Sequence, residues 1–282
     1  MADNAAHALK IRDKVIVITG GARGIGLATA TALHNLGAKV AIGDVDEVRV
    51  KESGAALGLD VYGRLDVTDP HSFSEFLDEV ERQLGPIDVL VNNAGIMPLG
   101  RIIEESDAVT RRILDINVYG VMLGTKLALE RMIPRKQGHI VNVASLAGET
   151  YIPGAATYCA SKHAVIGYTD AARIEYRGTG VQLSLVNPTF VNTELIAGTQ
   201  GAKGIKNAEP SDIADAIVKL VAHPKPRVRV TRLAGAIIAS QKFLPRGLSE
   251  GINRLLGGEH VFTDDVDVEK RKAYEDRARG AG

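Results

Sequence analysis

The sequence is poor in the residues that build cross-linked or metal-centred proteins. Its 282 residues include a single cysteine, Cys159, so no disulfide can form within the chain and no zinc-type cluster is available. Lysine and arginine number 34, and aspartate and glutamate also number 34, which makes the formal net charge zero. A balanced charge leaves no basic surface of the kind that binds nucleic acid. The sequence therefore argues against a disulfide framework, a metal centre and a nucleic-acid partner.

Long apolar segments are missing as well. No apolar run reaches the about 18 residues needed to span a bilayer. The first ten residues contain no apolar stretch of the kind found in a signal peptide. We therefore expect a cytoplasmic protein. A hydrophobic content of 45% and a charged content of 24% are ordinary for a globular protein with a sizeable core.

Short apolar runs rich in β-branched residues recur along the chain, and stretches with helical periodicity separate them. We predict strands at residues 14–19, 39–44, 60–65, 87–91, 138–143, 181–186 and 227–231. Helices are predicted at 46–57, 71–84, 106–115, 118–136 and 211–222, with a further one ending near Arg177. This alternation indicates an α/β fold, a doubly wound and mostly parallel seven-stranded sheet with helices on both faces.

A glycine-rich loop joins the first predicted strand to a helix. Gly20, Gly24 and Gly26 have the spacing Gly-x-x-x-Gly-x-Gly, and Arg23 and Ile25 lie between them. Glycines in this context let the backbone turn tightly and approach a pyrophosphate, which then rests on the helix N-terminus. The alternative is a flexible glycine turn, but the flanking strand and helix favour a dinucleotide site.

The second predicted strand ends in an acid, Asp44, eighteen residues after Gly26. A carboxylate at this position accepts hydrogen bonds from the ribose hydroxyls of NAD and repels the 2′-phosphate of NADP. Its neighbour Val45 offers a phosphate no charge, whereas Arg23 could bind one. We therefore favour NAD over NADP. Asp44 is also a candidate N-cap for the helix at 46–57, and one side chain could serve both purposes.

Two later strand ends add candidates for the same cofactor site. Asp66, next to Val67, follows the third strand, where it could bond the adenine amino group or act only as a turn acid. Asn93, Ala94 and Gly95 follow the fourth strand. Small residues at the carboxyl end of a strand next to the glycine loop would let a cofactor approach closely.

A possible proton-transfer pair lies on the helix that ends near Arg177. Tyr158 and Lys162 are four positions apart, so a helix places them on one face. A neighbouring ammonium favours the phenolate and lowers the pKa of a tyrosine. On its own, however, this spacing is more typical of a tyrosine and a lysine that lie side by side on the protein surface. Ser145 ends the fifth strand, and Asn117 interrupts two helical stretches where asparagine is unfavourable.

Together these motifs resemble the main single-domain branch of the short-chain dehydrogenase/reductase family, from about Lys14 to Thr231. The matching residues occur in the family's order: Thr19-Gly20-x-x-x-Gly24-x-Gly26, Asn92-Asn93-Ala94-Gly95, Asn117, Ser145, Tyr158-x-x-x-Lys162 and Pro188-x-x-Val191-x-Thr193. The sequence departs from the family after the sixth strand, where Pro188-Thr189 replaces the usual Pro-Gly, and its C-terminal pattern is not recognisable.

The resemblance implies an oxidoreductase that transfers a hydride between a nicotinamide cofactor and a secondary alcohol or ketone. Tyr158 would be the general acid or base, and Lys162 would lower its pKa and hold the ribose. Ser145 would bond the substrate oxygen, and Asn117 would hold a water on the proton path. Contacts to the nicotinamide would come from Pro188, Val191 and Thr193. No metal is required, and a homodimer or homotetramer is expected.

The C-terminal part stands apart from this pattern. We divide the chain into a cofactor-binding and catalytic domain, residues 1–232, and a helical extension, residues 233–282. Residues 233–256 are amphipathic and basic. They could cover an apolar substrate pocket, form a subunit contact or lie on a membrane surface. Residues 264–279 predict an exposed charged helix, and residues 197–209 a mobile loop.

Two other functions remain open at this stage. A nucleotide-binding sensor or scaffold could use the same fold, although it would have no need for the proton relay of Ser145, Tyr158 and Lys162. An epimerase or dehydratase that uses bound NAD transiently is weaker, because the chain looks too short for the substrate domain usual in such enzymes.

Overall fold

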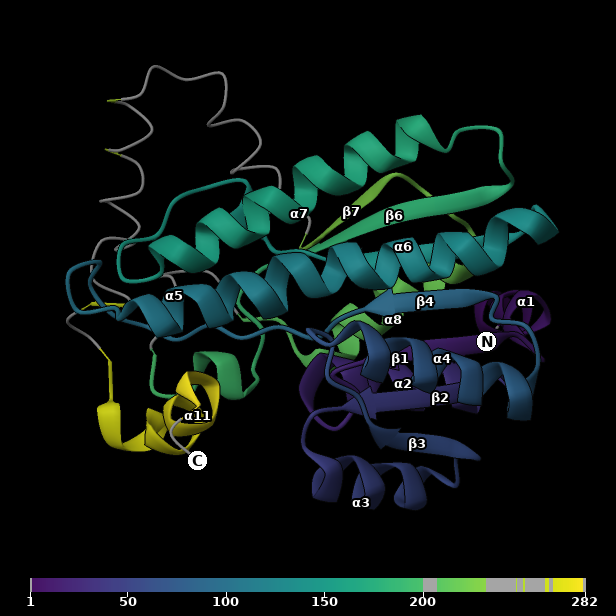
Figure 1. Cartoon of the computed structure of the whole chain (residues 1–282), viewed down its shortest axis with the longest axis horizontal. Helices are drawn as coiled ribbons and strands as arrows, with labels where there is room; N and C mark the ends of the chain where they lie inside the picture. The colour runs from purple at the N-terminus through teal and green to yellow at the C-terminus, as the bar shows by residue number, and fades with distance from the viewer. Residues whose placement is uncertain are drawn as a thin grey trace.

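The computed structural model describes residues 2–199, 207–231, 247, 251, 262–263 and 266–280. Its centre is a seven-stranded parallel sheet in the order β3-β2-β1-β4-β5-β6-β7 (Figure 1). The strands are β1 (Val15–Thr19), β2 (Lys39–Asp44), β3 (Val61–Arg64), β4 (Val89–Asn92), β5 (Gly138–Val143), β6 (Val181–Pro188) and β7 (Arg227–Val230). The predicted doubly wound α/β fold is confirmed.

Helices cover both faces of the sheet. One face carries α1 (Ala2–Ile11), α2 (Gly24–Asn35), α3 (Glu47–Leu57) and α8 (Pro210–Ala222). The other carries α4 (Pro70–Leu84), α6 (Gly120–Met132) and α7 (Ala156–Glu175), with α5 (Asp107–Leu114) against α7. Short helical turns are η1 (Asp115–Tyr119), η2 (Ile133–Arg135), η3 (Leu146–Gly148) and η4 (Glu194–Ile196).

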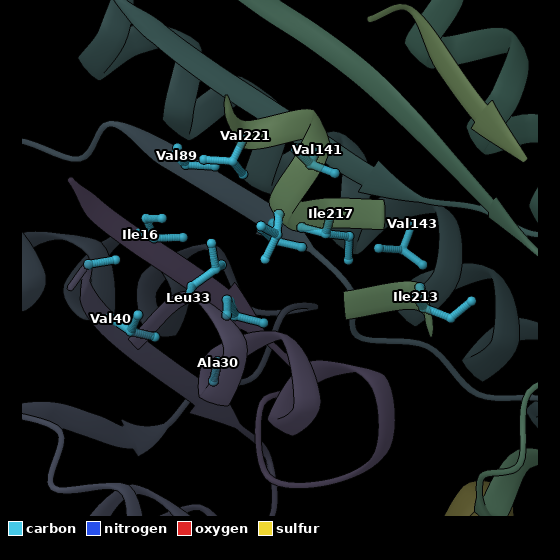
Figure 2. Close-up of a cluster of buried hydrophobic side chains, with 14 of the residues drawn as sticks. Ile16, Ala30, Leu33, Val40, Val89, Val141, Val143, Ile213, Ile217 and Val221 are labelled. Carbon is cyan, nitrogen blue, oxygen red and sulfur yellow. The ribbon is translucent and has the colours of Figure 1, made fainter. Parts of the chain in front are cut away.

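The central strand β1 shows why the fold has two cores. All five of its residues are buried, as expected of a parallel strand covered on both faces. Because side chains alternate along a strand, Ile16 and Ile18 point into the cluster under α2 and α8, while Val15 and Val17 point toward α4 and α6. Figure 2 shows the first cluster, in which Leu33 of α2 and Ile217 of α8 lie over the sheet.

The strand order reverses between β1 and β4, which are neighbours although β2 and β3 lie between them in the sequence. The loops that leave these two strands diverge to opposite faces of the sheet. In an open parallel sheet this reversal creates a crevice at the carboxyl ends of the strands, where ligands bind. The glycine loop after β1 and the Asn93–Gly95 loop after β4 both end there.

Three helical elements differ from the sequence prediction. The helix α1 was not predicted; its buried Ile11 joins the core, and it packs against α8. The two helices predicted at 106–115 and 118–136 are joined without a break through the π-helical turn η1, which contains Asn117. The predicted exposed helix at 264–279 is α11 (Val268–Arg279), and it is not simply exposed, because Arg271, Tyr274 and Ala278 are buried.

Figure 1 shows α11, in yellow, beyond one end of the sheet and below α5. A hydrogen bond from Arg112 Nε to the carbonyl of Ala278, 3.0 Å long, joins the two helices. The amphipathic segment at 233–256 lies outside the described residues except at 247 and 251, and so does the predicted domain boundary near 232. Of the loop predicted at 197–209, residues 200–206 lie outside them.

Candidate active site

A cavity of about 760 Å³ lies at the carboxyl ends of the strands. Segments that follow each of the strands β1 to β6 contribute to its wall, and so does the distant helix α11. All but two of the predicted site residues line it: Gly20, Arg23, Gly24, Ile25, Asp44, Asp66, Val67, Asn93, Ala94, Gly95, Ser145, Tyr158, Lys162, Pro188, Val191 and Thr193. The exceptions are Gly26 and Asn117, which lie behind the surface of the cavity.

Gly26 lies in the first turn of α2 and packs against the loop itself. A Cβ on Gly26 would be 2.1 Å from the carbonyl oxygen of Gly20, so only glycine allows this approach. The side-chain amide of Asn93 donates to the carbonyls of Thr19 at 2.9 Å and Gly20 at 3.1 Å, which ties the loop to the end of β4. The N-cap of α2, Arg23, makes no side-chain cap. The arrangement therefore suits an anion at the helix N-terminus.

The carboxylate of Asp44 is fixed by two main-chain amides. Its Oδ2 accepts from the N–H of Ala22 and its Oδ1 from the N–H of Asp46, both at 3.1 Å. Burial raises the pKa of Asp44, while these two hydrogen bonds act in the opposite direction. The alternative that Asp44 caps α3 is wrong: the N-cap is Asp46, which accepts from the N–H of Arg49 at 3.0 Å.

Arg23, the one residue that argued for NADP, has an acidic partner. Its Nη2 lies 2.6 Å from Oδ2 of Asp46, and its Nε lies 3.9 Å from a carboxylate oxygen of Glu194. The hydrogen bond from Arg23 lowers the pKa of Asp46. The positive charge of the guanidinium is thus already paired within the protein, which weakens its attraction for a phosphate.

Asp66 stabilises the turn after β3, which was one of the two roles predicted for it. Its Oδ1 accepts from the N–H of Thr68 at 3.0 Å and from the Thr68 hydroxyl at 2.7 Å. The residue still lines the cavity together with Val67. The turn role and a contact with a ligand are therefore compatible.

Ser145, Tyr158 and Lys162 meet on one side of the cavity. The ring of Tyr158 lies 5.6 Å from Nζ of Lys162, measured to the ring centroid. The Lys162 ammonium donates to the main-chain carbonyl of Val143, at the end of β5, at 3.0 Å. Ser145 lies two residues beyond the end of that strand, and it is close enough to Tyr158 to act on its pKa. The end of β5 thus positions both the Ser145 hydroxyl and the Lys162 ammonium near the phenol.

The pKa values of this group follow from burial. Burial raises the pKa of Tyr158 to about 12, although the hydrogen bond with Ser145 acts to lower it. Burial also lowers the pKa of Lys162 to about 8. In the protein without cofactor, burial therefore sets the direction of the Tyr158 pKa. The prediction that Lys162, helped by the positive charge of oxidised nicotinamide, lowers this pKa concerns the complex with cofactor and stays a prediction.

Asn117 lies in the turn η1 and is fully buried. Its amide oxygen accepts from the N–H of Ile96 at 2.8 Å, and its amide nitrogen donates to the carbonyl of Ile96 at 2.9 Å and to Ser161 at 3.1 Å. A Cβ on Gly95 would lie 3.3 Å from Oδ1 of Asn117 and 3.5 Å from Nζ of Lys162. The side chain therefore holds the loop after β4 against α7, close to the lysine.

The far wall of the cavity is apolar, and none of the residues that form it was among the predicted site residues. Apolar residues from five segments form it, among them Met97, Ile152, Phe190, Leu195 and Phe262. The rings of Phe190 and Phe262 meet edge to face with their centroids 5.6 Å apart. This end of the cavity suits a hydrocarbon group.

Helix α11 closes this wall by hydrogen-bonding the main chain of the loop after β4. Tyr274 Oη accepts from the N–H of Met97 at 2.8 Å, and Arg271 donates to the carbonyl of Met97 at 2.6 Å. The carboxylate of Glu275 accepts from the N–H of Leu99 at 3.1 Å. Residues 271, 274, 275 and 278 lie on one face of the helix. In a helix of mostly charged residues, this spacing was the one feature of the sequence that could have indicated the buried face.

Two general features bear on the kind of protein. Within the described residues, no helix is both long and apolar enough to cross a membrane. The same part of the chain holds no group of three histidine, cysteine, aspartate or glutamate residues arranged to bind a metal ion.

Known proteins share both the sequence and the architecture. "Probable oxidoreductase EphD" of Mycobacterium tuberculosis is 32% identical over 260 residues, which cover 84% of this chain. The chain spans only 44% of the length of that relative. "Cyclopentanol dehydrogenase" of a Comamonas species is 33% identical over 227 residues, 75% of this chain and 91% of the relative.

A solved structure, a short chain dehydrogenase/reductase from Burkholderia phymatum in complex with NAD, superimposes with a TM-score of 0.76 at 27% identity. The similarity covers 83% of this chain and 94% of that one. The sequence model of the family described as short chain dehydrogenase matches residues 14–203. The chain therefore belongs to the short chain dehydrogenase family of oxidoreductases.

Proposed function

We propose that the protein uses NAD to interconvert a secondary alcohol and a ketone, and that the substrate is mainly apolar. The observation that carries this proposal is the meeting of Ser145, Tyr158 and Lys162 in the same cavity as the glycine loop and Asp44. A nucleotide-binding sensor would need the loop and Asp44 but not the buried phenol and ammonium.

The residues fit a dinucleotide along the polar part of the cavity. The open N-terminus of α2 would hold the pyrophosphate. Asp44 would accept from the ribose hydroxyls, and its charge would oppose a 2′-phosphate. Asp66 and Val67 would lie at the adenine, and Pro188, Val191 and Thr193 at the nicotinamide. The relative solved with NAD and the pairing of Arg23 with Asp46 both support NAD over NADP.

When bound, the cofactor accepts a hydride, two electrons with one hydrogen nucleus, from the carbinol carbon. The hydroxyl proton of the alcohol would pass to the phenolate oxygen of Tyr158. The alcohol thus loses one hydride to the cofactor and one proton to Tyr158, and it leaves as the ketone. Ser145 would donate to the substrate oxygen and steady its charge. In the reducing direction Tyr158 returns the proton to that oxygen.

The pKa of about 12 for Tyr158 is too high for a base at neutral pH. Positive charge next to the phenol is therefore required, and two sources are available. The first is Lys162, and the second is the oxidised nicotinamide ring. Asn117 would contribute by fixing the Gly95–Ile96 backbone near Lys162, and we propose that water held there passes protons to solvent.

Turnover of a panel of secondary alcohols tests the proposal. The panel includes cyclopentanol, because a relative is named for it. Tyr158→Phe should lower kcat by a factor of about 10² to 10⁴, the usual contribution of a general acid or base. Its affinity for NADH should stay near that of the wild type. Tyr168→Phe, which removes a hydroxyl elsewhere on α7, is the matched control. Tight NADH binding without turnover of any alcohol would favour the sensor instead.

A further inference from the structure

A second phenol, that of Tyr274, lines the cavity opposite the main sheet. Tyr274 belongs to α11, is 8% exposed and borders the same cavity as Ser145 and Tyr158. Its oxygen accepts from the N–H of Met97 at 2.8 Å. Within the part of the chain that the structure describes, its own hydroxyl hydrogen has no acceptor. A phenol can both donate and accept, so this group has a donor left over.

The position of this hydroxyl is fixed from two sides. The guanidinium of Arg271 lies over the Tyr274 ring, 4.9 Å from its centroid. The same guanidinium donates to the carbonyls of Met97 and Leu195, both at 2.6 Å. Because Arg271 is 1% exposed, these bonds are shielded from water. The hydroxyl is therefore held in place, and it cannot swing toward solvent to find a partner.

The hydroxyl is a donor over the whole working range of an enzyme. Burial raises the pKa of Tyr274 above the ordinary value for a phenol, although Met97 and Arg271 act to lower it. Both phenols line the same cavity, and a negative charge on Tyr158 raises the pKa of Tyr274 further. Tyr274 is thus unsuited to accept the proton of the reaction and suited to donate a hydrogen bond.

The apolar surroundings of Tyr274 make its unpaired hydroxyl hydrogen energetically unfavourable. The wall around it is apolar, with Met97, Leu195 and Phe262 among its members. A buried polar hydrogen without an acceptor costs about 1–3 kcal/mol, and a ligand that supplies the acceptor recovers that loss. A pure hydrocarbon group in this part of the cavity leaves the donor unpaired.

We propose that Tyr274 donates a hydrogen bond to a second oxygen of the substrate, one that does not react. The preferred substrates are then compact apolar alcohols and ketones that carry a further hydrogen-bond acceptor. This inference rests on the proposed function for the identity of the reacting group, but the contact itself is a binding contact. Tyr274 is a specificity residue distinct from Ser145 and Tyr158, which serve the reacting oxygen.

Binding of ketones to the protein loaded with NAD tests this contact without chemistry, because no hydride is available in that complex. Calorimetry compares cyclohexanone with cyclohexane-1,4-dione and 2,2-dimethylcyclohexane-1,3-dione, two diones that stay neutral and do not modify arginine. At least one dione should bind the wild type about tenfold more tightly, the equivalent of about 1.4 kcal/mol. A methyl-substituted cyclohexanone, similar in size without the acceptor, should show no such gain.

Tyr274→Phe should abolish the preference for the dione and leave cyclohexanone affinity within about twofold, a change of about 0.4 kcal/mol. Tyr168→Phe should keep the preference. Equal weakening of all the ketones in Tyr274→Phe would assign the hydroxyl to packing and overturn the proposal. The proposal is also overturned if the wild type binds no dione more tightly than cyclohexanone. This second test needs no variant, so it holds even if Tyr274→Phe fails to fold. Oxidation of NADH by the same ketones is measured separately, so a ketone that binds but does not react counts against the proposed function alone.

Discussion

Nζ of Lys162 lies 5.6 Å from the ring centroid of Tyr158, and its hydrogen bond goes to the backbone carbonyl of Val143. The two side chains are one helical turn apart on α7, and both are buried. The ammonium is therefore held by the end of β5 rather than by solvent. Burial at this site destabilises the protonated form of Lys162 and lowers its pKa to about 8.

This burial predicts how stability changes with pH in the protein without cofactor. The pKa of Lys162 falls from 10.5 to about 8 on folding, so between these values the unfolded chain binds more protons. The free energy of unfolding should therefore rise with pH in this window. Urea unfolding of the wild type and of Lys162→Met should show a difference that grows in favour of the wild type from about pH 8 to pH 10.

The upper limit of that window is the ordinary pKa of Lys162, 10.5, and Tyr158 also titrates near it. The pKa of Tyr158 rises from 10.0 to about 12 on folding, so above pH 10 it acts in the opposite direction. Subtracting the variant from the wild type cancels groups that titrate in both. A difference that stays constant or shrinks between pH 8 and pH 10 would mean that Lys162 keeps its proton in the folded protein.

Cofactor choice should depend on Asp44. The wild type should bind NADH at least about tenfold more tightly than NADPH, since a carboxylate next to a 2′-phosphate costs about 1.4 kcal/mol or more. Asp44→Ser should lose most of that preference in fluorescence titrations. Arg23→Ala is the companion variant and should leave NADH affinity little changed. If the wild type binds NADPH better and Arg23→Ala loses that binding, Arg23 rather than Asp44 controls the choice.

Two helical glycines form a matched pair. In Gly26→Ala the new methyl group would collide with the backbone of Gly20, so unfolding free energy should fall by about 1–3 kcal/mol. NADH affinity should fall too, because the loop must shift. In Gly167→Ala the new methyl group meets no atom within 4 Å, and stability should rise by about 0.5–1 kcal/mol. Equal effects from both variants would show that close packing is not what requires glycine at 26.

Arg271 should contribute far more to stability than its neighbour on α11. Arg271→Met leaves the carbonyls of Met97 and Leu195 without their donor and removes one of the partners of Glu275, a loss of about 3 kcal/mol or more. Lys272→Met breaks only the exposed pair with Asp276, worth about 0.5 kcal/mol or less. Denaturant unfolding measures both. A similar small loss in both variants would mean that the buried guanidinium does not hold α11 in place.

The polar half of the site was predictable because it follows strand ends. Gly20, Asp44, Asn93 and Ser145 each come just after a β-branched apolar run. Parallel strands bring all such ends to one edge of the sheet, so position in the sequence translates directly into position in the cavity. Their roles in binding and catalysis stay predictions. The rise in the pKa of Tyr158 without cofactor was not predicted, since burial cannot be read from a helical spacing of four residues.

The apolar half was beyond sequence reasoning for a different reason. The residues of α11 that close the cavity are Arg271, Tyr274, Glu275 and Ala278, and only one of them is a large apolar residue. These four residues share one helix face, but hydropathy assigns an arginine to the exposed side, and Arg271 is buried for its hydrogen bonds to carbonyls far away in the sequence. The π-helical turn around Asn117 was predicted only as an interruption, since hydropathy does not distinguish a widened turn from a break.

The hydrogen bond between Met97 and Tyr274 links residues 177 positions apart. A chain made from its N-terminus has all seven strands in place before α11 is synthesised, so the sheet and its polar crevice can assemble first. The apolar part of the cavity is completed last, by a segment that contributes nothing to the sheet. If the proposed function holds, substitutions on the inner face of α11 should alter which molecules the protein accepts while the cofactor half stays as it is.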